Sequence, residues 1–164
     1  CITKTTSLPE MPSKPSKIFI TFYIPNNMKK KEYVAFLFAH FALFVVFVWF
    51  GSLKFFDLSP ANPLVDALLK ETLPFISFNA FIMILGGWEV LIGLLFIIPK
   101  MEKVALILLI PHMLVTIMPL FLLPDIAWHG LFTPTLEGQY IIKNIVIIAL
   151  AASMFADLKK KRLE

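Results

Sequence analysis

The sequence has little charge, a single cysteine and no common catalytic motif. Charged residues make up 16% of its 164 residues, whereas an ordinary soluble domain has about 25%. Because Cys1 is the only cysteine, one chain cannot form a disulfide, a Cys-x-x-Cys redox pair or a thiolate metal site. The P-loop, Gly-x-Gly-x-x-Gly and His-Glu-x-x-His patterns are absent. The sequence therefore has no motif of a soluble nucleotide-binding enzyme or zinc hydrolase.

Apolar residues dominate what is present. Hydrophobic residues make up 59% of the chain, including 17 phenylalanines, and the mean hydropathy is +0.83. A soluble globule of this size could not bury so much apolar surface, and a disordered chain would have far less of it. The net charge of +4 would suit nucleic-acid binding, but the lysines cluster beside apolar segments. We therefore expect an integral membrane protein whose partner is the lipid bilayer and not a nucleic acid.

Four apolar segments predict four membrane-spanning helices. Residues 33–56, 73–99, 104–123 and 138–156 each come close to the roughly 20 apolar residues that cross about 30 Å of hydrocarbon. The predicted fold class is an all-α integral membrane four-helix bundle. The alternative is a set of buried helices in a soluble bundle. It is disfavoured because no segment has the polar stripe of a soluble amphipathic helix.

The positions of lysine and arginine predict the orientation of these helices. Lys29–Lys31 precede the first segment, Lys100 and Lys103 lie between the second and third, and Lys159–Arg162 follow the fourth. Positive residues favour the cytoplasmic side of a membrane. Both termini are therefore expected in the cytoplasm, and the bundle is expected to run up-down-up-down.

Three stretches lie outside the four segments. Residues 1–27 are rich in proline, serine and threonine, which predicts a disordered tail before a membrane domain over residues 28–164. Prolines after the first segment predict its end, and leucines with helical spacing predict a short interfacial helix behind them. Residues 124–137 carry Trp128 and Phe132, which are typical of a membrane interface.

Ionisable residues inside the four segments are the candidate functional groups. Such residues cost about 2.5–3.5 kcal/mol each on insertion scales, so they usually face the bundle interior and have partners. Helical depth predicts an inner layer of His40, Glu89 and His112 and an outer layer of Lys54 and Lys143. A structural alternative exists for each. The lysines can reach the outer interface and the acid can fix helix register through an ion pair. The histidines can be hydrogen-bonded core residues or, less expectedly, ligands of a haem or metal.

Small residues accompany the polar groups on the same helical faces. Gly51 and Lys54 share one face of the first segment, and Gly86 and Gly93 share a face with Glu89 on the second. Glycines on a membrane helix allow another backbone to approach closely. We therefore expect close helix contacts beside the ionisable residues.

Four motifs occur in order along these segments. The first segment ends in WFGSLKF, and the proline-containing loop SPANPL follows it. The second contains GGWE and then Gly93, and the fourth opens with EGQYIIKN. Together these motifs resemble those of the DoxX-like superfamily of small four-span membrane proteins, and of its YkgB-type branch. The resemblance covers about residues 30–157.

The resemblance implies a compact four-helix bundle with three signature polar residues. These are the candidate catalytic residues: Glu89, Lys54 and Lys143. Four other residues, from the motifs or from the intramembrane pattern, are candidate ligand-binding residues: His112, His40, Trp88 and Asn144. No metal site is expected.

Some members of the superfamily are subunits of thiosulfate:quinone oxidoreductase or of other membrane redox complexes. By resemblance we expect a redox-associated protein of the bacterial inner membrane that binds a quinone or another small apolar molecule. Glu89 would bind or relay a proton, and Lys54 and Lys143 would hold an anionic or carbonyl group. A redox partner subunit or a homo-oligomer is expected, and whether the chain is itself an enzyme stays open.

Two other functions are weighed against this one. The first is a non-enzymatic membrane scaffold or assembly subunit, in which the same buried ion pairs are structural. The second is a transporter or channel. It is less expected because four spans with short loops leave little room for a pore in a monomer.

Overall fold

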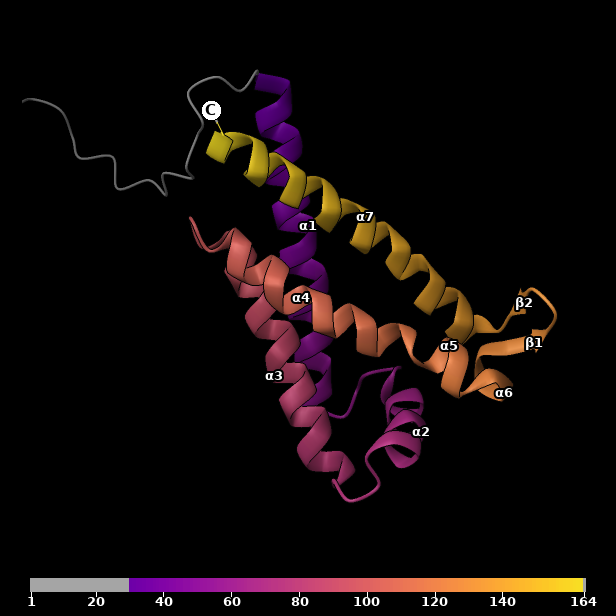
Figure 1. Cartoon of the computed structure of the whole chain (residues 1–164). Helices are drawn as coiled ribbons and strands as arrows, with labels where there is room; N and C mark the ends of the chain where they lie inside the picture. Colours follow the sequence, from indigo (N-terminus) through magenta and orange to yellow (C-terminus); the bar gives the residue numbers. More distant parts are fainter. Residues whose placement is uncertain (1–29, 164) are drawn as a thin grey trace, which may run out of the picture.

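The computed structural model describes the backbone of residues 30–163 and the side chains of residues 33–156 (Figure 1). The tail expected over residues 1–27 lies outside the described residues. In chain order the elements are α1 (Lys30–Phe55), α2 (Asn62–Thr72), α3 (Phe78–Ile97), α4 (Glu102–Ile117), α5 (Pro119–Leu122), α6 (Pro124–Ala127), β1 (Trp128–Gly130), β2 (Thr133–Pro134) and α7 (Leu136–Leu163).

Four helical stretches are long and apolar enough to cross a membrane. They are Tyr33–Phe55, Phe78–Ile97, Glu102–Leu122 and Leu136–Ala156. Four spans, as the sequence predicts, are thus confirmed by length and composition. Most of their surface is exposed and apolar, which suits a lipid solvent, because lipid tails are as apolar as the side chains that face them.

Prolines explain one shifted segment boundary and the division of another span into two helices. The second span begins at Phe78 and not at residue 73, because Leu73–Ser77 form a turn that contains Pro74. The third span is divided at Pro119, which begins the separate helix α5. Proline lacks the N–H that would continue the ladder, and its ring clashes with the carbonyl four residues earlier. Pro111, in contrast, lies inside the continuous helix α4.

The end of α1 is fixed by a left-handed residue. Asp57 has φ 57° and follows the last turn of α1, where Leu58 N–H donates to Leu53 O at 3.0 Å. This is the Schellman arrangement, in which a residue with positive φ lets the chain satisfy the last helical carbonyls. The Asp57 carboxylate also accepts a hydrogen bond of 2.6 Å from the amide of Asn62, the first residue of α2. The helix expected after the first span is therefore present, and its start is tied to the end of α1.

The helices α1 and α3 pack closely and run antiparallel (Figure 1). A Cβ atom on Gly51 would lie 2.9 Å from Glu89 Cβ and from Gly86 O, and one on Gly86 would lie 2.9 Å from Gly51 O. Further toward the start of α1, Val48 contacts Gly93. The two backbones can touch only because neither glycine carries a side chain. The predicted close approach of glycine faces is confirmed.

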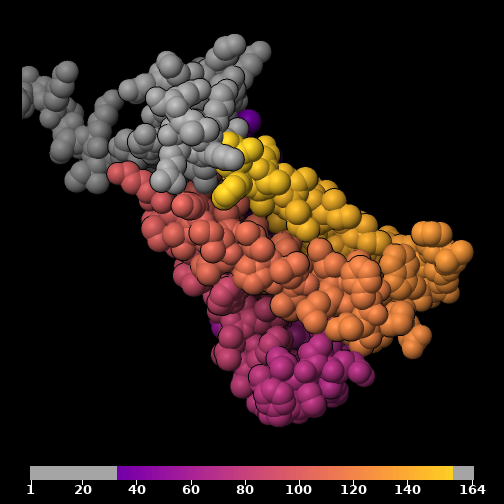
Figure 2. Space-filling model, viewed as in Figure 1, coloured from indigo at the N-terminus to yellow at the C-terminus, as the bar shows by residue number. Residues whose placement is uncertain are grey.

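The hydrophobic core joins all four long helices. Its buried members are Leu43 and Phe47 of α1, Ile92, Leu95 and Phe96 of α3, Ala105, Leu106, Leu109 and Met113 of α4, and Met154 of α7. The helix α7 lies beside α4 on the face shown in Figure 2, but little of its span is buried. Val146 in the middle of α7 is 70% exposed. The molecule is thus a closely packed pair of α1 and α3, with α4 packed on α3 and α7 packed on α4.

A small hairpin precedes α7. The strands β1 and β2 pair antiparallel within residues 124–137, a segment for which no strand was predicted. Two strands of three and two residues are too short to give a period-2 pattern. Thr135 sets the start of α7, because its hydroxyl accepts from Gly138 N–H at 3.1 Å and donates to Ile126 O at 2.7 Å. Gly138 lies directly against Ala127 O, with no room for a Cβ atom.

Candidate functional site

A buried ion pair joins α1 to α3. The Lys54 ammonium donates to Glu89 Oε2 at 2.6 Å, and the two residues are only 5% and 7% exposed. Side chains on a helix lean toward its N-terminus. Because α1 and α3 are antiparallel, Lys54 and Glu89 lean in opposite directions and converge over the Gly51–Gly86 contact. The glycines thus bring the helices near enough for the ion pair to form.

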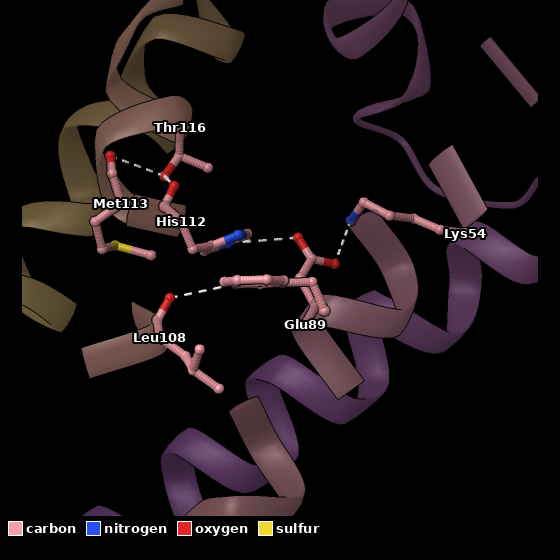
Figure 3. A network of polar contacts seen from close by, with 7 residues as sticks. Lys54, Glu89, Leu108, His112, Met113 and Thr116 are labelled. Atoms are coloured by element: carbon pink, nitrogen blue, oxygen red, sulfur yellow. Dashed lines mark hydrogen bonds and ion pairs between the residues drawn. The ribbon is translucent and has the colours of Figure 1, made fainter. Parts of the chain in front are cut away.

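A histidine from α4 completes this cluster (Figure 3). His112 Nε2 lies 3.5 Å from Glu89 Oε1, and the His112 and Phe47 rings pack edge to face with centroids 5.5 Å apart. The Glu89 carboxylate therefore has one oxygen on the ammonium and the other facing the imidazole. We call these three residues the Lys54–Glu89–His112 network. It links three of the four long helices.

The second ring nitrogen of His112 has no hydrogen-bond partner. Nδ1 is buried and unpaired, which is unusual because buried polar side-chain atoms are nearly always hydrogen-bonded. His40 shows the ordinary solution, since its Nδ1 lies 2.8 Å from the carbonyl of Phe36, four residues earlier. The corresponding carbonyl for His112 belongs to Leu108, and it accepts the indole N–H of Trp88 at 3.2 Å. The indole thus occupies the acceptor that His112 would otherwise use.

An apolar groove lies beside the network, between α3 and α4. It has a volume of about 200 Å³ and is lined by Phe81, Ile84, Leu85 and Trp88 of α3 and by Pro111, His112 and Val115 of α4. Ile84 is 68% exposed and Trp88 is 37% exposed, so the groove opens onto the outer surface of the helices. Its wall presents only apolar atoms, including carbon atoms of the His112 and Trp88 rings. The predicted candidate Trp88 therefore lies both in the groove and next to the acid of the network.

The two predicted layers of ionisable residues are confirmed only for Glu89 and His112, which lie together. Lys54 joins Glu89, while His40 lies near Phe96 and 3.5 Å from Glu102 Oε1. The prediction compared Cα depths and neglected the length and lean of the lysine side chain, which bring the amine back along α1. Eleven residues, or about 16 Å of helix axis, separate His40 from Gly51, at whose level Glu89 lies.

Lys143 and Asn144 lie apart from the network. Lys143 is exposed on α7, with its ammonium 5.1 Å from the centroid of the Tyr140 ring, and Asn144 is half-buried beside it. Among the described residues, no ion pair joins Lys143 to Glu89. The expectation that Lys54 and Lys143 hold one group together stays a prediction, and the structure places the two lysines in different surroundings. The physical reason is that α7 is attached along α4, while Lys54 points between α1 and α3.

Three features of the site were not predicted. They are the contact of Glu102 with His40, the bond from Trp88 to Leu108, and the groove beside Pro111. A signal existed for the first, because Glu102 begins α4 in a turn at the end where α1 starts. The other two depend on how α3 and α4 cross, and the spacing of residues along one helix carries no information on that angle.

Within the described residues, no group of three or more histidine, cysteine, aspartate or glutamate side chains could hold a metal ion. No family model, no curated protein and no solved structure matches this chain.

Proposed function

We propose that this chain is a DoxX-like integral membrane protein of the bacterial inner membrane. It binds a quinone or another small apolar molecule in its helical bundle and serves as a redox-associated subunit. The observation that carries the proposal is the Lys54–Glu89–His112 network at the wall of an apolar groove. Buried charges in a membrane protein mark functional sites more often than they mark packing alone. An apolar pocket with a few converging polar groups is the usual form of a small-molecule site.

The proposal assigns a role to each member of the network. Glu89 binds or relays a proton, because its carboxylate lies between the imidazole and the ammonium. Lys54 supplies the balancing charge, and His112 is the member that reaches the groove. The motifs WFGSLKF, GGWE and EGQYIIKN resemble those of the DoxX-like superfamily and support the family assignment. The redox role is proposed for this chain because some members of that superfamily have it.

The proposal also includes an up-down-up-down topology with cytoplasmic termini. The beginning of α1, the α3–α4 turn and the last turns of α7 are drawn toward the same end of the molecule in Figure 1. The contact of His40 with Glu102 supports the proximity of α1 to that turn. The clusters of lysine at these three places favour the cytoplasmic side.

The test is to purify the protein with its native lipids and identify what is bound. Wild type, Glu89→Gln and Glu71→Gln are compared by absorbance and by mass spectrometry of extracted small molecules. Glu71 is exposed on α2, so its variant is a matched control for the loss of one carboxylate. We expect one bound quinone per chain in wild type and the control, and about tenfold less in Glu89→Gln. A wild-type chain without quinone or any other bound apolar molecule would contradict the proposal.

A scaffold role is the second candidate, and the closed form of the ion pair favours it. Lys54 and Glu89 satisfy each other without a ligand, and Trp88 ties α3 to α4 through Leu108. A structural ion pair can often be replaced by apolar residues of similar volume. The double variant Lys54→Met, Glu89→Leu therefore separates the two candidates. A scaffold keeps its assembly with its partner subunit after this substitution, whereas a ligand-binding subunit folds and loses its bound molecule.

A further inference from the structure

The least explained charge of the molecule is that of Lys143 on α7. The roles proposed above involve the Lys54–Glu89–His112 network and give Lys143 none. This lysine lies inside the apolar stretch Leu136–Ala156, seven residues or about 10 Å from its start. It is exposed, and no carboxylate of the described residues forms an ion pair with it. A charge that faces outward within a span is therefore left to be explained.

The contact that Lys143 makes within the chain offsets only part of its cost. Its ammonium lies 5.1 Å from the centroid of the Tyr140 ring, one turn earlier on α7. Such a cation–π contact is worth about 0.5–1 kcal/mol at an exposed site. A lysine within a bilayer costs about 2.5–3.5 kcal/mol on insertion scales, and such residues usually pair with an opposite charge. A carboxylate that faces the ammonium would supply the missing compensation.

The surface of α7 around this lysine has the composition of a helix contact. At 100° per residue, five exposed residues fall within a sector of about 120°, which we call the Lys143 face: Gln139, Lys143, Val146, Ala149 and Ser153. Small residues four apart allow another backbone to approach closely, and glutamine and serine can form hydrogen bonds between membrane helices. Only 11% of the α7 span is buried, against 22–39% of the other three, and Figure 2 shows α7 along the edge of the molecule beside α4.

A second copy of the chain does not suit the Lys143 face. A symmetric contact presents the same patch from both copies, so it would bring two uncompensated ammonium groups together. Other faces of a second copy have no free acid at this depth, since the acids within the described spans are Glu89, Glu102 and Glu137. The first is buried in its ion pair, and the second faces a histidine at the other end of the helices. The third lies about 9 Å nearer the start of α7.

We propose that the Lys143 face docks a transmembrane helix of a different protein, which carries an aspartate or glutamate facing Lys143. The two charges form an ion pair within the bilayer, while Ala149 and Ser153 admit the partner helix closely. The lysine also gives specificity, because a helix without the acid would leave the ammonium uncompensated. This inference deepens the proposed function and rests on it for the redox nature of the partner subunit.

The proposal is tested by photo-crosslinking in the intact membranes of cells that make the protein. The photoreactive residue p-benzoylphenylalanine replaces Val146, which lies on the Lys143 face and is 70% exposed. The same residue in place of Ile110 of α4, which is 61% exposed, is the control for random contacts with membrane proteins. Mass spectrometry of the crosslinked peptide then identifies the segment that contacts each position.

We expect position 146 to crosslink to one segment of another membrane protein, with an aspartate or glutamate within one helical turn of the crosslink. Lys143→Met should lower the yield at least about tenfold, because the partner's carboxylate then has no counter-charge. Lys143→Arg keeps the charge and should keep the adduct. Lys70→Met is the matched control, because Lys70 is an exposed lysine outside the spans and is already paired with Asp66.

Charge reversal covers the case in which Lys143→Met does not fold. Lys143→Glu should abolish the adduct, and replacing the identified carboxylate of the partner by lysine should restore it. A folding defect would not be restored by a substitution in another protein. An adduct between two copies of this chain, crosslinks to lipid alone, or a partner segment without an acid would each overturn the proposal. Equal yields in wild type and Lys143→Met would also overturn it.

The proposed function fails differently, by absence of quinone from the native-lipid preparation. A chain that carries quinone but forms no charge-dependent adduct keeps the ligand-binding role and loses the docking surface. A chain that forms the adduct but carries no quinone keeps the docking surface and loses the redox role.

Discussion

At the scale of single residues, the central fact is a charge pair removed from both water and lipid. The Lys54 ammonium and the Glu89 carboxylate are 2.6 Å apart between α1 and α3. The free energy of such a pair depends on both members being present, because either one alone is an uncompensated buried charge. Replacing one member of the pair should therefore cost much stability, whereas replacing both members by apolar residues should cost little.

This difference predicts the stability of two variants. Glu89→Gln should lower the free energy of unfolding by about 3–5 kcal/mol, because Lys54 is left without its counter-charge. The double variant Lys54→Met, Glu89→Leu should be at least as stable as wild type, because no charge remains buried. Titration with a denaturing detergent, followed by circular dichroism, measures both. A double variant as unstable as Glu89→Gln would show that the pair contributes more than charge balance.

Sequence reasoning found these residues and one of the two partners of Glu89. A lysine, a glutamate and two histidines inside apolar segments stand out in any sequence, because each is costly in a bilayer. Their Cα depths suggested that Glu89 would meet both His40 and His112. Only His112 faces it, and the lysine reaches it from the next turn of α1. The reach and lean of long side chains decide such pairings, and depth arithmetic omits both.

At the scale of elements, glycine sets how closely α1 and α3 approach. Gly86→Ala should lower the free energy of unfolding by about 1–3 kcal/mol, because the new Cβ would press on Gly51 O. The neighbouring Gly87→Ala is the control. A Cβ there meets nothing within 4 Å, so this variant should be neutral or slightly more stable. Equal loss in both variants would mean that backbone flexibility and not helix contact is the reason for glycine at position 86.

The start of α7 depends on a threonine. Thr135→Val should cost about 1 kcal/mol, because the cap on Gly138 N–H and the bond to Ile126 O are both lost. Thr133→Val removes an exposed hydroxyl from the same hairpin and should have little effect. Thermal melting in one detergent compares the two variants. A larger drop in melting temperature for Thr133→Val than for Thr135→Val would show that the hairpin, and not the Thr135 cap, stabilises the start of α7.

The elements were predicted well where they are long and poorly where they are short. Four runs of apolar residues leave little choice of structure, because a membrane helix satisfies all its backbone groups internally. Pro74 shifted the start of the second span, Pro119 divided the third span without moving its end, and the hairpin before α7 was missed. The last of these follows from hydrogen bonds between a few residues, such as Thr135 with Ile126, that have no periodic pattern.

At the scale of the whole molecule, the proposed topology can be tested by chemical labelling. In a Cys1→Ser background, Lys100→Cys places one thiol in the α3–α4 turn and Thr133→Cys places one in the exposed hairpin. A membrane-impermeant thiol reagent added to intact cells should label Thr133→Cys and not Lys100→Cys. Both should react after the membrane is opened. The reverse pattern would invert the proposed orientation, and labelling of both in intact cells would contradict the four-span topology.

The contact between Gly51 and Gly86 also limits which sequences can encode this molecule. A Cβ atom at either position would clash with the backbone oxygen of the other glycine. Because glycine is already the smallest residue, a change at one position cannot make room for a larger residue at the other. In a genetic selection for second-site suppressors of Gly86→Ala, position 51 therefore offers no solution. Suppressors should arise instead where α1 and α3 can tilt or shift as whole helices, for example at Val48 beside Gly93. A substitution at one of the two glycines therefore cannot be compensated by a substitution at the other.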